Sequence, residues 1–129
     1  MPLLERHLAR MAVLAAGTIA TFSPALASGD AGRGEEVYRQ CAACHSFDPA
    51  ERRPGPHLQG LFGRTAGAVE GFRYSDAMAA SGIVWDDETL RAYLLDPRGN
   101  LPGTRKPVGL RDEADIEDVL AYMRQEGGS

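Results

Sequence analysis

The chain has 129 residues, of which 43% are hydrophobic and 25% charged, a length that allows one domain and excludes a large multidomain enzyme. There are 14 basic and 18 acidic residues, so the formal net charge at pH 7 is −4. An acidic chain of this kind is not expected to bind nucleic acid.

Residues 1–27 carry the three regions of an export signal. The start is basic, residues 11–22 form a short apolar run, and residues 25–27 read Ala-Leu-Ala, which is typical of a cleavage site. The apolar run is short against the roughly 20 residues that span a bilayer, so an uncleaved membrane anchor is the less favoured alternative. The sequence therefore predicts a signal peptide at 1–27, a periplasmic location and a single domain at 28–129.

Four short helices are expected in this domain, and no segment shows the alternation of a strand. In chain order they cover residues 30–40, 76–81, 87–96 and 113–127, with N-caps at Asp30, Ser75, Asp86 and Asp112. In the last helix, apolar residues recur at helical spacing at Ile116, Val119, Leu120 and Met123. The sequence predicts an all-α protein.

Two irregular stretches, 46–71 and 100–110, join these helices. Both are rich in proline and glycine, which exclude a long helix or a regular strand. The first stretch also contains spaced apolar residues, as expected of a loop that wraps an apolar body: Leu58, Leu61 and Phe62, with Phe72 just beyond it. A long ordered loop in so small a domain points to an embedded cofactor.

The two cysteines lie in the sequence Cys41-Ala42-Ala43-Cys44-His45. In a Cys-x-x-Cys-His pattern, both thiols can add to haem vinyl groups while the adjacent imidazole reaches the iron. The alternatives are a disulfide, a redox dithiol, or half of a zinc site completed by His57. A redox dithiol is expected in a β-α-β context, which this sequence does not show. A zinc site would require the adjacent residues Cys44 and His45 to bind the metal together. None of the three alternatives explains the long loop. We therefore expect one covalent haem c.

Separated motifs carry a family resemblance over residues 28–126. They are Gly55-Pro56-His57-Leu58, Gly60-Leu61-Phe62-Gly63-Arg64, Gly71-Phe72-Arg73-Tyr74-Ser75, Gly82-Ile83-Val84-Trp85, Tyr93-Leu94, Pro97, Pro102-Gly103-Thr104, Gly109-Leu110 and Ala121-Tyr122. Together with the haem motif, they make the chain similar to the class I cytochromes c of the soluble mitochondrial and bacterial type. The resemblance implies the cytochrome c fold, in which short helices and ordered loops surround one covalently attached haem.

The resemblance also implies roles for individual residues. His45 is expected to be the proximal iron ligand, and the Pro56 carbonyl would accept a hydrogen bond from its other ring nitrogen, which fixes the tautomer. His57 would lie on the same side and is not expected to bind iron. The other implied cofactor-binding residues are Arg64, Tyr74 and Trp85, which would bond the haem propionates, and Tyr93 and Thr104.

One position departs from the family pattern. The loop that supplies methionine as the sixth ligand reads Pro102-Gly103-Thr104-Arg105-Lys106, so lysine stands where methionine is expected. Met78 and Met123 were assigned to packing, and Lys106 is the only lysine beside 13 arginines. Deprotonating a lysine at pH 7 requires about 4.6 kcal/mol, which an iron bond must offset. We expect His45/Lys106 coordination, with Tyr93 orienting the amine or a bound water. The alternative is an open sixth position, five-coordinate or water-bound, with Lys106 extended to solvent.

These expectations predict a one-electron carrier and not an enzyme. Its partners would be membrane or soluble oxidoreductases, met through weak and transient contacts by a monomer. Arg52, Arg53, Arg98 and Arg105 are candidates for a local basic patch, the alternative being solvated loop charges. A second function is a haem sensor of small ligands or a weak peroxidase with a displaceable Lys106, although no distal His and Arg pair is assigned.

Overall fold

The computed structural model describes residue 17 and residues 29–128 of the chain. The predicted signal peptide and the cleavage before Ser28 lie outside these residues, apart from Gly17. Within the described part, no helix has the length and apolar character needed to cross a membrane.

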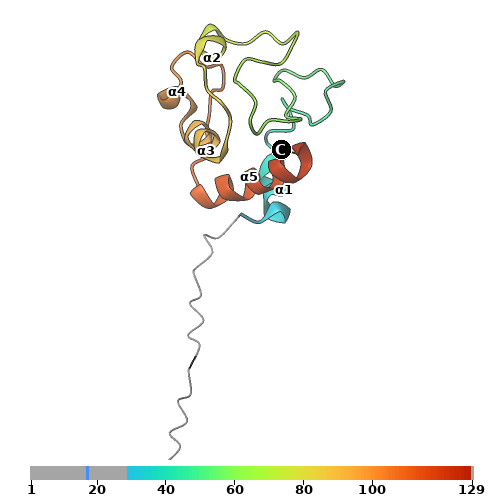
Figure 1. Cartoon of the computed structure of the whole chain (residues 1–129), viewed down its shortest axis with the longest axis vertical. Helices are drawn as coiled ribbons and strands as arrows, with labels where there is room; N and C mark the ends of the chain where they lie inside the picture. The colour runs from blue at the N-terminus through green and yellow to red at the C-terminus, as the bar shows by residue number, and fades with distance from the viewer. Residues whose placement is uncertain (1–16, 18–28, 129) are drawn as a thin grey trace, which may run out of the picture.

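The described residues form five helices joined by irregular segments (Figure 1). Their bounds are α1 Ala31–Tyr38, α2 Asp76–Ala80, α3 Asp87–Leu95, α4 Pro97–Asn100 and α5 Glu113–Gly127. Residues 29–128 contain no extended strand, only an isolated bridge between Thr65 and Val84. The prediction of an all-α class is confirmed.

The predicted N-caps are confirmed at all four helices. The side chains of Asp30, Ser75, Asp86 and Asp112 each accept a hydrogen bond from a backbone N–H in the first turn. The prediction did not include α4, which Asp96 caps through the N–H of Gly99, with Pro97 at the first helical position. The first helix ends at Tyr38 and not at Gln40, because the chain there enters the turn that carries Cys41.

The first and last helices cross in direct contact at Gly34. A Cβ on Gly34 would lie 2.0 Å from the carbonyl oxygen of Asp118 and 2.8 Å from Cβ of Tyr122. The buried carboxylate of Asp118 accepts from the backbone N–H of Asp30 at 2.6 Å and from Nε of Arg33 at 3.0 Å. The bond from Arg33, followed by that from Asp30, lowers the pKa of Asp118, so the carboxylate stays ionised and holds α1 against α5.

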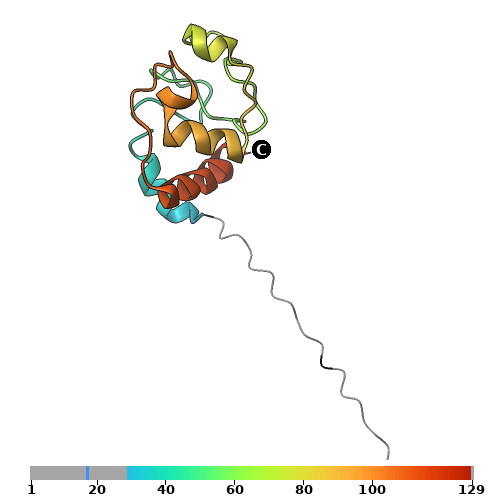
Figure 2. The same ribbon diagram turned by 90° about the vertical axis from the view of Figure 1, so that its left-hand side faces the viewer.

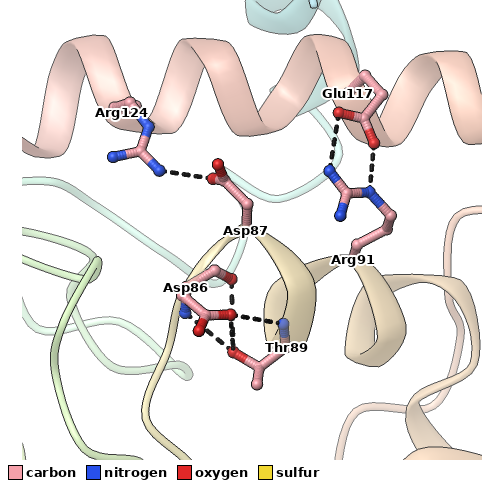
Figure 3. Close-up of polar contacts among 6 residues, drawn as sticks. All are labelled: Asp86, Asp87, Thr89, Arg91, Glu117 and Arg124. Carbon is pink, nitrogen blue, oxygen red and sulfur yellow. Dashed lines mark hydrogen bonds and ion pairs between the residues drawn. The ribbon is translucent and has the colours of Figure 1, made fainter. Parts of the chain in front are cut away.

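Two ion pairs hold α3 along α5, as Figure 3 shows. The guanidinium of Arg124 lies 2.5 Å from Asp87, and Arg91 binds Glu117 through two nitrogens. The capping box of Asp86 and Thr89 at the start of α3 appears in the same view. These contacts fix the helix that carries Tyr93.

The apolar core lies where α3 and α5 meet the chain around α1, with Ile116 and Val119 fully buried. Figures 1 and 2 both place α1 and α5 at one end of the molecule and α2 at the other. Tyr38, at the end of α1, stacks on Phe47 with ring centroids 5.0 Å apart. Since Cys41 follows Tyr38 by one turn, the helix pair positions the haem motif.

Substitution of Gly34 tests the helix crossing. Gly34→Ala places a methyl group against backbone atoms of α5, and we expect it to lower the free energy of unfolding by about 2–3 kcal/mol, as overpacking does. Gly32→Ala is the matched control, because a Cβ there meets only the Asp30 carboxylate, at 3.1 Å, within the same helix. We expect the control to be as stable as the wild type or more stable. Equal losses in urea unfolding of the two variants would contradict the proposed crossing.

Candidate haem site

A cavity of about 550 Å³ opens between the helices and the two irregular stretches. Every residue predicted to bind or hold the cofactor lines it: Cys41, Cys44, His45, Pro56, Arg64, Tyr74, Trp85, Tyr93, Thr104 and Lys106. Apolar side chains complete the wall, among them Leu58, Leu61, Phe72, Leu90 and Leu94. Residues that lie up to 65 positions apart in the chain thus share one largely apolar chamber.

The ring of His45 is held in one orientation. Its Nδ1 lies 2.7 Å from the carbonyl oxygen of Pro56, and because a carbonyl only accepts, Nδ1 donates and Nε2 keeps a free lone pair. Burial lowers the pKa of His45, so the ring is neutral, as an iron ligand must be. A Cβ on Gly55 would lie 2.5 Å from Cε1 of this ring, so only glycine allows the backbone to approach so closely.

The two cysteines sit on the same turn as His45. The backbone N–H groups of Cys44 and His45 both donate to the carbonyl of Cys41, at 3.0 and 2.9 Å. Both thiols are free, and burial raises the pKa of Cys41, which keeps it a neutral thiol. The described residues contain no group of three or more His, Cys, Asp or Glu side chains that could hold a metal ion.

Arg64 brings a positive charge to the cavity wall. Its guanidinium donates to the carbonyls of His57 and Gln59, at 2.9 and 3.1 Å. Burial lowers the pKa of Arg64, yet a guanidinium remains charged. Among the residues described, no carboxylate pairs with it, and three of its five N–H groups remain for an anion in the cavity.

Tyr74 and Trp85 also face the cavity. The hydroxyl of Tyr74 accepts from the backbone N–H of Val69 at 3.1 Å, which leaves its own hydrogen to donate. The buried indole of Trp85 packs against Tyr93, with ring centroids 5.3 Å apart. Backbone hydrogen bonds join Trp85 to Gly63 and Arg64, so the indole and the loop that carries the guanidinium are held together.

Lys106 is half-buried and lines the cavity. Burial is the main cause of the lowered pKa of His45, and the positive charge of Lys106 lowers it further. Burial raises the pKa of Cys41, and the charge of Lys106 opposes that rise. Lys106 and the haem motif thus line the same cavity.

Tyr93 contacts the loop of Lys106 in a way that the sequence did not suggest. Its hydroxyl lies 2.5 Å from Oγ1 of Thr104, and that same oxygen accepts from the backbone N–H of Lys106 at 3.5 Å. Burial raises the pKa of Tyr93, so the phenol is neutral. Tyr93 thus holds the loop of Lys106 through Thr104.

Sequence reasoning missed two contributions to this wall. Arg105 donates to the carbonyl of Arg73 at 2.7 Å and to that of Tyr74 at 3.4 Å, which fastens the Lys106 loop to the chain before α2. Met78, assigned to packing, does touch the core but also lines the cavity. His57 does not line it, in agreement with the expectation that it is no iron ligand.

A haem fits this set of residues. The cavity is largely apolar, and the neutral ring of His45 and the two thiols of the same turn line it. The guanidinium of Arg64 also lines it and has no carboxylate partner among the described residues. The close approach of Gly55 to the ring of His45 leaves the imidazole little freedom to turn.

Comparison with known proteins leads to the same family. The cytochrome c family model matches residues 31–126. Cytochrome c2 from Blastochloris viridis is 47% identical over 108 residues, covering 82% of this chain and 84% of that protein. Cytochrome c2 from Rhodoblastus acidophilus is 43% identical over 100 residues, covering 76% and 94%. The solved structure of cytochrome cH from Methylobacterium extorquens superposes with a TM-score of 0.71 at 37% identity, covering 75% of this chain and 99% of that one.

The family model spans nearly all of the described domain, including the haem motif. The chain belongs to the cytochrome c family: it is a c-type cytochrome, an electron carrier and not an enzyme, with haem c bound covalently through Cys41 and Cys44.

Proposed function

We propose that this protein is an exported one-electron carrier whose haem iron is bound axially by His45 and, in the ferric state, by Lys106. The observation that carries the proposal is the position of Lys106. It lines the same cavity as His45, on the loop where the family supplies methionine, and the chain has no methionine on that loop.

Haem c supplies an iron that gains and loses one electron. The chain's part is to hold that iron and to exclude water. His45 stays neutral because of burial, and Pro56 fixes its tautomer and makes Nε2 a stronger donor. The apolar wall limits solvent access, which favours the less charged ferrous state. A hard axial donor has the opposite effect and favours the ferric state.

Arg64, Tyr74 and Trp85 are the proposed partners of the haem propionates. Support comes from the charge of Arg64, which is half-buried and meets only backbone carbonyls. A charge in such a position is stabilised by an opposite charge, and a propionate in the cavity supplies one. Tyr74 has a hydroxyl hydrogen left to donate to the same group.

An amine from Lys106 is a harder donor than a thioether and favours ferric iron. The midpoint potential is therefore expected to lie below that of a family member with a methionine ligand. Two features support the position of the amine: the Tyr93 to Thr104 bond and the hold of Arg105 on the chain before α2.

Location and partners complete the proposal. The signal-like residues 1–27 support export to the periplasm with a mature domain at 28–129. The partners are membrane or soluble oxidoreductases that meet a monomer transiently. Two arginines of the candidate basic patch are exposed but already have partners in the chain. Arg53 forms an ion pair with Glu51 and donates to the carbonyl of Ala42, and Arg105 donates to backbone carbonyls.

Two substitutions of Lys106 test the axial ligand. We expect ferric wild-type protein to give the low-spin electron paramagnetic resonance of an imidazole–amine pair. Lys106→Met replaces the amine by a thioether and raises the midpoint potential, because the softer donor favours ferrous iron. Lys106→Arg keeps the charge but cannot deprotonate, so it separates ligation from charge.

The amine signature is expected to vanish in both variants. Its persistence in Lys106→Arg would show that the signal arises elsewhere. A high-spin wild-type signal, unchanged in both variants, would mean that Lys106 leaves the iron free.

The hydrogen bond from Tyr93 to Thr104 offers a separate test of how the loop is held. We expect Tyr93→Phe and Thr104→Val each to lower the free energy of unfolding by about 1 kcal/mol, since each removes one partner of a buried pair. Denaturation of the double variant completes the cycle, with an expected coupling of about 1 kcal/mol. Strictly additive losses would mean that the two hydroxyls do not support each other.

A further inference from the structure

A second potential iron ligand lies beside Lys106. Met78, on α2, lines the haem cavity while its flank packs against the core. Met123 also lines the cavity, but it lies on α5 and is 5% exposed within the core cluster. A thioether on the cavity wall is the kind of donor that iron in this family accepts.

The structure places Met78 next to the loop that carries Lys106. The guanidinium of Arg105 binds the carbonyls of Arg73 and Tyr74, at 2.7 and 3.4 Å, just before α2 begins. A Cβ on Gly103 would lie 3.1 Å from Cβ of Ala77, so the loop and α2 touch. Met78 follows Ala77 and Lys106 follows Arg105, and both side chains enter the cavity from these neighbouring segments.

The helix α2 and the segment after α4 lie apart from the loop that follows the haem motif. In Figure 1, α2, α3 and the orange segment after α4 lie to the left or at the top, and the green loop after the haem motif lies to the right. His45 is bound to that loop through Pro56. Met78 and Lys106 therefore line the same cavity as His45 from segments outside that loop.

The short helix α2 contacts the core through Met78, and its other contacts are to loops. Among the described residues it packs against no other helix, whereas α1, α3 and α4 each contact a neighbouring helix. It is held by its Ser75 cap and by the Lys106 loop, and glycines with positive φ flank it, Gly71 at 75° and Gly82 at 67°. A shift of α2 toward the iron breaks no helix–helix contact.

We propose that Met78 is the sixth ligand of the ferrous state and exchanges with Lys106 when the iron is reduced. The proposal rests on the proposed function. A thioether is a soft donor and prefers ferrous iron, whereas an amine prefers ferric iron. The electron comes from the redox partner and goes to the iron. The iron–nitrogen bond to Lys106 breaks, the iron–sulfur bond to Met78 forms, and the released amine takes a proton from water.

Nuclear magnetic resonance of the reduced holoprotein tests this exchange. A methionine methyl bound to low-spin ferrous haem lies over the ring, whose current shifts its proton resonance far upfield. With methionine labelled at its methyl carbon, we expect one such shifted methyl in the wild type. It should disappear in Met78→Leu, which keeps an apolar side chain of similar size, and remain in Met123→Leu, the matched control from the same cavity.

Each outcome decides the proposal. Absence of a shifted methyl in the reduced wild type, or shifted lysine methylene resonances in its place, would overturn it, as would loss of the shifted methyl in Met123→Leu alone. Electron paramagnetic resonance of the same sample after oxidation reports on Lys106 separately. An amine signature there without a ferrous methionine signal refutes the exchange and leaves the proposed function intact. Loss of the amine signature refutes the ligation by Lys106 itself.

Discussion

The structure depends on a chamber that its own side chains do not fill. Its walls enclose about 550 Å³ and come from the haem motif, both irregular stretches and three helices. A small domain buries little apolar surface by itself, so this interior becomes a core only when a large apolar group occupies it. The direct contact of α1 with α5 at Gly34 and the ion pairs between α3 and α5 keep the walls in place around that group.

The two sides of the chamber are built differently. On the side of His45, the ligand is fixed by neighbours in sequence: a turn from Cys41, the Pro56 carbonyl and the close approach of Gly55. On the opposite side, Lys106 lies on a loop without helical structure, held by single bonds from Tyr93 and to the carbonyls of Arg73 and Tyr74. A change of ligand is therefore easier to accommodate opposite His45 than at His45 itself.

Local signals in the sequence were sufficient for the caps and the haem motif. Asp30, Ser75, Asp86 and Asp112 act through bonds to residues two or three positions ahead, so their roles are visible in a short window. The helix α4 was not predicted, because it spans four residues and is too short for a periodic pattern.

The opposite wall was only partly predictable. The site of Lys106 followed from the spacing of family motifs, but the bond between Tyr93 and Thr104 joins separate elements and has no local signature. The orientation of the Met78 side chain could not be predicted either, since α2 spans five residues and is too short for a periodic pattern. Tertiary contact alone decides that this side chain reaches the cavity.

The central claim is that the amine of Lys106 binds ferric iron, and the composition of the chain allows an unusually direct measurement. Because the chain has one lysine, labelling lysine with ¹⁵N at Nζ marks Lys106 alone. Pulsed electron paramagnetic resonance of the ferric holoprotein then detects any ¹⁵N nucleus bound to the iron. We predict a strong hyperfine coupling from one ¹⁵N. A spectrum that shows only the ¹⁴N couplings of the haem and of His45 would contradict lysine ligation.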